Sequence, residues 1–244
     1  RRPAGPVSGG ADPTLRRLAP MSPPPTPVRL PLWPLPLLCA LLPLVATWIA
    51  FALSVQGGHI EACNPFWDGC TSISRAARHG LGNAVFRALV LPAAMLQVLL
   101  WWLLRHWLRG LGRDPGAALS ALGLVAGAFL ALYATFLGTE GEIYQLLRRY
   151  GVTIYFAATY LALLLVLRHL HRPAADRLYR PLLVVALAML ALGIASTVAS
   201  ATVAGEAARH RIENVLEWQL GLWLTAMFAL VAWRWRASAS VLPP

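Results

Sequence analysis

Long apolar segments alternate with short polar ones along most of the chain. Each apolar segment has about 20 residues, which as an α-helix is enough to cross a hydrocarbon core about 30 Å thick. The pattern predicts six membrane spans: Trp33–Val55, Ala84–Leu104, Ala118–Gly138, Gly151–Leu170, Pro181–Ala204 and Val215–Trp233. The predicted fold class is therefore all-α, an integral membrane bundle of six transmembrane helices.

The apolar pattern is absent from the first part of the chain. Residues 1–32 are rich in Pro and Gly and show no apolar periodicity, a composition typical of disorder. We therefore expect a disordered N-terminal tail over 1–32, a six-span transmembrane domain over 33–235 and a short C-terminal tail over 236–244.

The charges of the chain are few and strongly biased. Only 13% of residues are charged, the net charge is +11, and all 21 basic residues are Arg. A nucleic-acid-binding protein concentrates its basic residues on one face or stripe. Here they gather at the ends of the apolar segments, so the sequence argues against a nucleic-acid partner.

The distribution of Arg predicts how the chain lies in its membrane. With six spans, 14 arginines fall on the side of the termini and seven on the other side. Because the cytoplasmic side of a membrane protein carries the excess of Arg and Lys, we expect both termini in the cytoplasm. The Ala- and Leu-rich composition without Lys favours a bacterial inner membrane over a eukaryotic endomembrane.

The first outer loop, EACNPFWDGCTSISRAARHG, is the longest polar stretch between spans. It carries Cys63 and Cys70, and the compartment outside the cytoplasm is oxidising, so we expect these two thiols to form a disulfide. Pro65 and the pair Asp68-Gly69 can turn the chain back between them. A metal site is the rival interpretation, but this spacing is not a zinc spacing.

The second half of this loop predicts a short helix. Ser72 or Ser74 can cap its start, and Gly80 can end it. One interpretation is an interfacial helix that only connects two spans. The other is a lipid-headgroup site in which Arg75 and Arg78 hold a phosphate near the amides at the start of the helix.

Acids and histidines recur on the same outer side. A candidate polar cluster consists of His59, Glu61, Glu140, Glu142, His210 and Glu213. Together such groups could bind a metal or supply a general base, although acids also simply keep outer loops soluble. Glu217 and Trp218 are expected at the start of the sixth span, where Glu217 is the one acid near the body of a span. No cofactor motif or metal-site spacing is present, and we expect neither group.

The order of these features resembles the FRAG/DRAM/SFK family of six-span membrane proteins. The resemblance is carried by Ser72-Ile73-Ser74 after Cys70, and by Glu217-Trp218 near the start of the last span. Members include damage-regulated autophagy modulators and a Golgi protein of GPI-anchor lipid remodelling. The resemblance implies a role in lipid handling or membrane regulation, and it brings no catalytic mechanism with it.

Three functions stay open at this point. The first is a membrane protein that engages or regulates lipids, with anionic or phospholipid headgroups bound at Ser72, Ser74, Arg75, Arg78, Glu217 and Trp218. The second is a metal-assisted lipid-modifying hydrolase or transferase that uses the polar cluster. The third is a small transporter. Whether the chain is an enzyme is not decided by its sequence.

Overall fold

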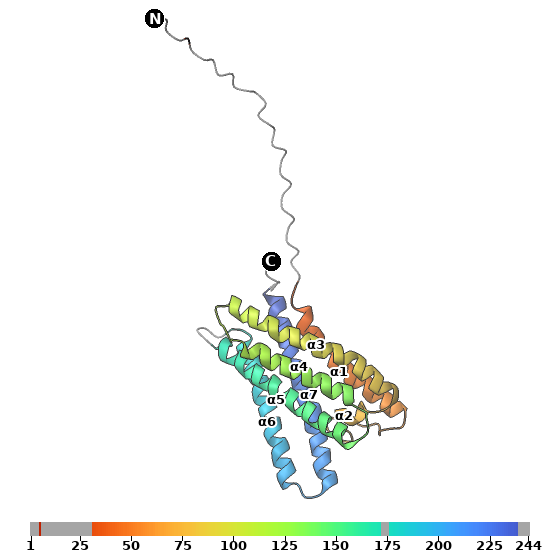
Figure 1. The fold of residues 1–244 in the computed structure, drawn as a ribbon. Helices are drawn as coiled ribbons and strands as arrows, with labels where there is room; N and C mark the ends of the chain where they lie inside the picture. Colours follow the sequence, from red (N-terminus) through yellow and green to blue (C-terminus); the bar gives the residue numbers. More distant parts are fainter. Residues whose placement is uncertain (1–4, 6–30, 172–175, 239–244) are drawn as a thin grey trace.

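The computed structural model describes residues 5, 31–171 and 176–238, and it is helical throughout its regular parts (Figure 1). In chain order the helices are α1 (Pro34–Gln56), α2 (Ile73–Ala76), α3 (Gly80–Gly110), α4 (Ala118–Phe136), α5 (Glu142–Leu170), α6 (Tyr179–Thr202) and α7 (Glu206–Ala237). All except α2 are long and apolar enough to cross a membrane. The predicted six-span, all-α fold is confirmed.

Several helices extend beyond the predicted spans. α5 begins at Glu142 and α7 at Glu206, each nine residues before the start that the apolar pattern predicts. The added segments, EIYQLLRRY and EAARHRIEN, are polar but contain good helix formers such as Glu, Ala, Leu and Arg. The helices therefore continue out of the apolar layer, and Glu217 lies near the start of the predicted span but well inside the helix, 11 residues after the start of α7 at Glu206.

The predicted tails lie almost entirely outside the described residues. Of the predicted tail 1–32, only residues 5, 31 and 32 are described, and Leu32 is buried against the bundle core. At the other end, α7 runs through Ala237, and residues 239–244 are outside the described part. Residues 32–171 and 176–237 therefore form the packed structure.

The long helices pack mainly on their neighbours in the bundle. α1 packs on both α3 and α7, α4 lies between α3 and α5, and α6 packs on α7 but only thinly on α5. Helices α3 and α4 approach closely at Gly123 and Gly127, where a Cβ atom would collide with the side chains of Trp101 and Val98. This G-x-x-x-G spacing lets the two helix backbones come together, as is common in membranes.

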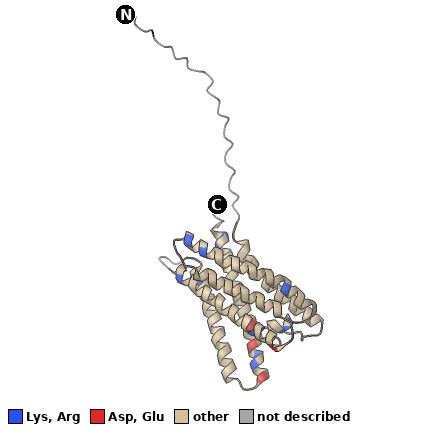
Figure 2. Ribbon diagram, in the orientation of Figure 1, with Lys and Arg blue, Asp and Glu red and all other residues tan. Residues whose placement is uncertain are grey.

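The bundle has two distinct ends. At the termini end α1 starts beside the end of α7, and the Arg236 guanidinium lies over the Trp33 ring at 5.3 Å. The opposite end carries the loop with Cys63 and Cys70, and we call it the disulfide end. Acidic residues gather toward the disulfide end (Figure 2).

The connection between α6 and α7 reaches beyond the other helices at the disulfide end (Figure 1). Side chains from residue 190 to residue 212 are almost all exposed or half-buried. The outer halves of these helices therefore form a hairpin that separates from α5, which leaves space between α5 and α6.

Candidate functional site

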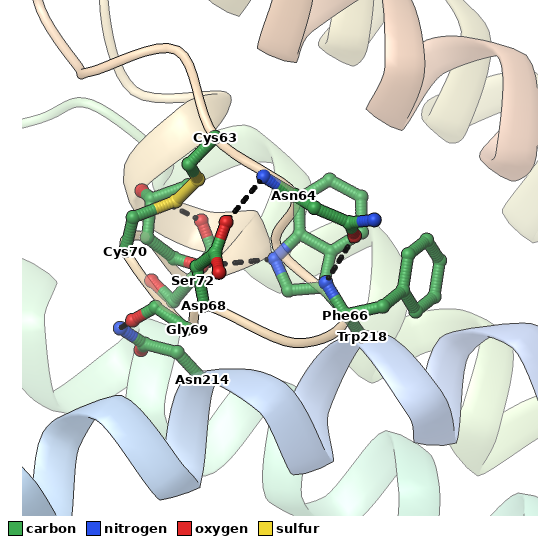
Figure 3. The surroundings of a disulfide bond; sticks show 10 residues. Cys63, Asn64, Phe66, Asp68, Gly69, Cys70, Ser72, Asn214 and Trp218 are labelled. Atoms are coloured by element: carbon green, nitrogen blue, oxygen red, sulfur yellow. Dashed lines mark hydrogen bonds between the residues drawn. A yellow bond between two sulfur atoms is a disulfide. The ribbon is translucent and has the colours of Figure 1, made fainter.

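The loop between α1 and α3 is closed by a disulfide at the disulfide end (Figure 3). Cys63 and Cys70 are bonded, with their Cα atoms 6.6 Å apart, which confirms the predicted pairing. Between them, the Asn64 amide donates to the Asp68 carboxylate at 2.8 Å, and the Asn64 side-chain oxygen accepts from Phe66 N–H at 3.1 Å. These local bonds give the loop a compact turn.

This loop lies directly on α7 (Figure 3). The Asn214 side chain donates to the Gly69 carbonyl at 2.8 Å, and the Trp218 indole N–H donates to the Thr71 carbonyl at 2.9 Å. Trp218 is almost fully buried, and its ring packs within 6 Å of the rings of Trp48 and Phe66. The loop is thus held to the last helix by polar and aromatic contacts together.

The short helix α2 begins as predicted but ends earlier. Ser72 caps it, its hydroxyl accepting from the Arg75 amide at 3.1 Å, while the helix stops at Ala76 rather than near Gly80. The Glu217 carboxylate accepts hydrogen bonds from the Ile73 and Ser74 amides. An acid of α7 therefore already occupies the amides at the start of α2.

Beneath α2 and this loop lies an apolar cavity of about 410 Å³, which we call the central cavity. Its volume falls in the range of small-molecule sites, roughly 300–1,000 Å³. Side chains of α1, α3, α4, α5 and α7 line it, together with Phe66 of the loop and Ile73 of α2. It extends along α7 from Glu217 to Phe228, which is about 16 Å at the helical rise. This is about half the thickness of a hydrocarbon core.

Two polar groups mark the deeper part of this cavity. Gln97 of α3 is fully buried in its wall, and Tyr155 of α5 lies beside it. Neither amide atom of Gln97 makes a hydrogen bond of normal geometry among the described residues. Apart from these two groups, the polar lining residues are Thr47 and Thr225, with Tyr133 and Glu217 nearer the disulfide end. The remaining lining is apolar, so the central cavity suits a hydrocarbon chain.

Glu217 and Tyr133 line the end of the central cavity that lies toward the disulfide end, which we call the cavity mouth. Arg78, Arg148 and Glu217 all lie close enough to the Tyr133 hydroxyl to interact with it electrostatically. The Arg148 guanidinium donates to the carbonyls of Phe136 and Thr139, which satisfies backbone groups at the end of α4. Arg78 is exposed.

The candidate polar cluster is divided in the structure. His210 bridges Glu206 and Glu213 at 3.3 Å each on the exposed hairpin, and the Ser200 hydroxyl donates to Glu213 at 2.8 Å. Glu61, Glu140 and Glu142 are exposed. Within residues 31–171 and 176–238, no three His, Cys, Asp or Glu side chains are placed to hold a metal ion.

His59, another member of the candidate polar cluster, lies against a second histidine. Its ring stacks on that of His79 at 4.8 Å, just before α3. Burial, together with the nearby His59 and Arg78, lowers the pKa of His79 below its usual range. The neutral form of His79 is therefore favoured, and the pair belongs to the loop rather than to the acids of α5 and α7.

The predicted headgroup residues are close together around α2. Ser72 and Ser74 hydroxyls are 3.1 Å apart, Arg75 and Arg78 are exposed, and Glu217 contacts the same helix. Their role in lipid binding stays a prediction. The cavity itself was missed, because no sequence motif signals a space that five helices enclose. Arg148 and Tyr133 were missed for the same reason.

Together, the six spans, the disulfide-closed loop and the apolar cavity define a multi-pass integral membrane protein. The chain belongs to the Frag1/DRAM/Sfk1 family, since the family model described as "Frag1/DRAM/Sfk1/Cwh43P N-terminal domain" matches residues 31–237. This confirms the resemblance seen in the sequence. Searches of curated proteins and of solved structures found no match.

Proposed function

We propose that this protein binds a membrane lipid at its disulfide end, with a hydrocarbon chain in the central cavity and the headgroup at the cavity mouth. The observation that carries the proposal is the cavity itself. It is apolar, it lies within the spanning helices, and its mouth has exposed Arg78 beside it.

The headgroup contacts supply most of the binding free energy. A lipid chain gains little by leaving the bilayer for the cavity, since lipid tails are as apolar as the cavity wall. Charge-assisted hydrogen bonds from Arg to phosphate contribute more, about 1.5–3 kcal/mol each. Arg78 and Arg75, both exposed on the segment above the cavity, are the residues we assign to the phosphate.

The remaining predicted headgroup residues have positioning roles in this proposal. Ser72 caps α2, Glu217 binds its first amides, and Trp218 holds the preceding loop through Thr71. Ser74 lies beside Ser72. These contacts keep α2 with Arg75, and Arg78 just after it, over the cavity.

The same proposal includes a direction in the membrane. The excess of Arg at the termini end supports a cytoplasmic position for both termini, by the positive-inside rule. The disulfide end then faces the oxidising side of a bacterial inner membrane, which suits the disulfide. The bound lipid would come from the outer leaflet.

Lipid retained on the purified protein tests the proposal. The double variant Arg75→Ala/Arg78→Ala should retain anionic phospholipid roughly a hundredfold less tightly, because two charge-assisted contacts of about 1.5–3 kcal/mol each are lost. Thr225→Trp, which fills the central cavity from α7, should also reduce retention. Both are measured by mass spectrometry of the extracted lipids at equal protein concentration.

Arg177→Ala is the matched control, because Arg177 is an exposed arginine at the termini end. It should retain as much anionic lipid as the unmodified protein. Equal retention in all the variants would refute the proposal. A loss in the double variant but not in Thr225→Trp would place the headgroup at α2 and the chain elsewhere.

A further inference from the structure

A second apolar cavity, of about 440 Å³, lies between α5, α6 and α7. We call it the α5–α6 groove. Its lining includes Phe156 and Tyr160 of α5, Gly193 and Thr197 of α6, and Leu220 of α7. These residues all belong to helices that cross the membrane, so bilayer lipid surrounds the groove.

The groove exists because α6 leaves α5 toward the disulfide end. Nearer the termini end the two helices are tied by the Tyr160 hydroxyl, which donates to the Ala186 carbonyl at 3.2 Å. Beyond this bond, Gly193 has no side chain, and a Cβ atom placed there would meet nothing within 4 Å. The space is therefore open to a chain from the surrounding lipid.

The groove and the central cavity share a wall. Phe156 lines both, and on α7 the neighbours Leu220 and Gly221 line the groove and the central cavity respectively. Where they adjoin, the two spaces are thus separated by little more than one aromatic side chain and the edge of one helix.

The two spaces also match in size and direction. Along α6 the groove runs from Met189 to Val198, about 13 Å at the helical rise, against about 16 Å for the central cavity along α7. The groove lies in the disulfide-side half of the bundle, the central cavity begins at the same end and reaches past the middle to Cys39 and Phe228, and their volumes are about 440 and 410 Å³. They therefore form two adjoining channels of similar capacity.

A cation lies on the helix face above the shared wall. Arg149 precedes Phe156 by seven residues, which places both on one face of α5 with Arg149 about 10 Å nearer the disulfide end. Arg149 is exposed and forms no ion pair with any acid in the described part of the chain. A phosphate joined to chains on either side of Phe156 would lie within its reach.

We propose that the ligand is a two-chain lipid, with one chain in the central cavity, the other in the α5–α6 groove, and its phosphate between Arg78 and Arg149. This inference rests on the proposed function and specifies its ligand class. Single-chain lipids and sterols would fill only one of the two spaces.

The test compares a diacyl phosphatidylglycerol with its one-chain lyso form, each added to the purified protein and measured by native mass spectrometry. The unmodified protein should bind the diacyl lipid at least tenfold more tightly. Gly193→Trp fills the groove, so it should bring diacyl binding down to the lyso level and leave lyso binding unchanged. Gly193→Ala is the matched control and should keep the preference.

The outcomes separate the two proposals. If Gly193→Trp keeps the diacyl preference, the two-chain inference is overturned while the proposed function stands. If the unmodified protein binds neither lipid, both are overturned. A change of oligomeric state in Gly193→Trp with unchanged diacyl preference would assign the groove to a second copy of the chain, against the inference. Ile194→Trp fills the same groove and replaces Gly193→Trp if that variant does not fold.

Discussion

Gly69 is the residue on which the docking of the disulfide-closed loop on α7 depends most directly. Its φ is +60°, a conformation that L side chains rarely adopt, and a Cβ atom there would collide with the Arg211 carbonyl of α7. Its own carbonyl accepts the bond from Asn214. One glycine therefore allows both the turn and the close approach to the last helix.

Gly69→Ala should destabilise the protein more than Gly58→Ala does. Both positions have positive φ, +60° and +69°, so both variants lose about 1–2 kcal/mol in backbone conformation. Only the methyl group added at Gly69 meets a neighbour, because nothing lies within 4 Å at Gly58. The added collision should displace the loop and weaken the Asn214 and Trp218 bonds, each worth about 0.5–1.5 kcal/mol.

Thermal unfolding in detergent measures this difference. The melting temperature should fall clearly further for Gly69→Ala than for Gly58→Ala. Equal falls would mean that the loop is not held against α7 at this point.

Residue chemistry at the site could be predicted only in part. The disulfide followed from Cys63 and Cys70 in an outer loop, and the cap from Ser72, because both are local features of the sequence. The role of Glu217 did not follow. Its partners, the Ile73 and Ser74 amides, lie on a segment more than 140 residues earlier, and only packing brings them together.

Among the helices, the firmest link at the termini end is an ion pair. The Asp176 carboxylate before α6 accepts two bonds from Arg234 of α7, at 2.8 and 2.7 Å, and one from the Leu178 amide at 2.9 Å. Arg234 also lies over the Trp107 ring of α3 at 5.4 Å. Three helices are therefore joined through one guanidinium.

Asp176→Asn should lower the melting temperature, with a loss of about 1.5–3 kcal/mol for the charge-assisted bonds. Asp114→Asn is the matched control, since the Asp114–Arg109 pair has the same chemistry but is largely exposed, and exposed pairs contribute little. The melting temperature of the Asp114 variant should therefore be close to that of the unmodified protein. Equal losses in the two variants would contradict a special role for the Asp176 pair.

The pH dependence of this link has a definite sign. The Arg234 guanidinium holds the pKa of Asp176 below its usual range. As the pH falls below about 4, the Asp176 carboxylate is therefore protonated in the unfolded chain before it is protonated in the folded protein. The stabilisation by the Asp176–Arg234 pair is complete above that pH. It is lost as the pH falls through the lowered pKa of Asp176 in the folded protein.

The positions of the helices could be predicted where the helices are apolar. Each of the six spans was predicted on a helix that is long and apolar enough to cross a membrane, because a membrane requires about 20 apolar residues for each crossing. The starts of α5 and α7 were not, since hydropathy reports contact with lipid and not the length of a helix. A polar segment such as Glu206–Asn214 can remain helical in water, so its structure does not follow from apolarity.

For the whole molecule, the asymmetry of Arg between the two ends predicts orientation. Alkaline phosphatase, which is active only outside the cytoplasm, should be active when fused into the α6–α7 connection and inactive when fused at the C-terminus. GFP fusions should give the reverse result, because GFP fluoresces after folding in the cytoplasm. Active phosphatase at the C-terminus would invert the proposed topology.

The contacts of the disulfide-closed loop with α7 also set the sequence of folding steps during synthesis. The Gly69–Asn214 and Thr71–Trp218 bonds span 145 and 147 residues. At about 5–20 residues per second, the ribosome needs roughly 7 to 30 s to make the intervening chain. During that interval the loop has no α7 to bind, so its disulfide can close well before it docks. The last helix to be made, α7, is thus the one that binds the loop between α1 and α3.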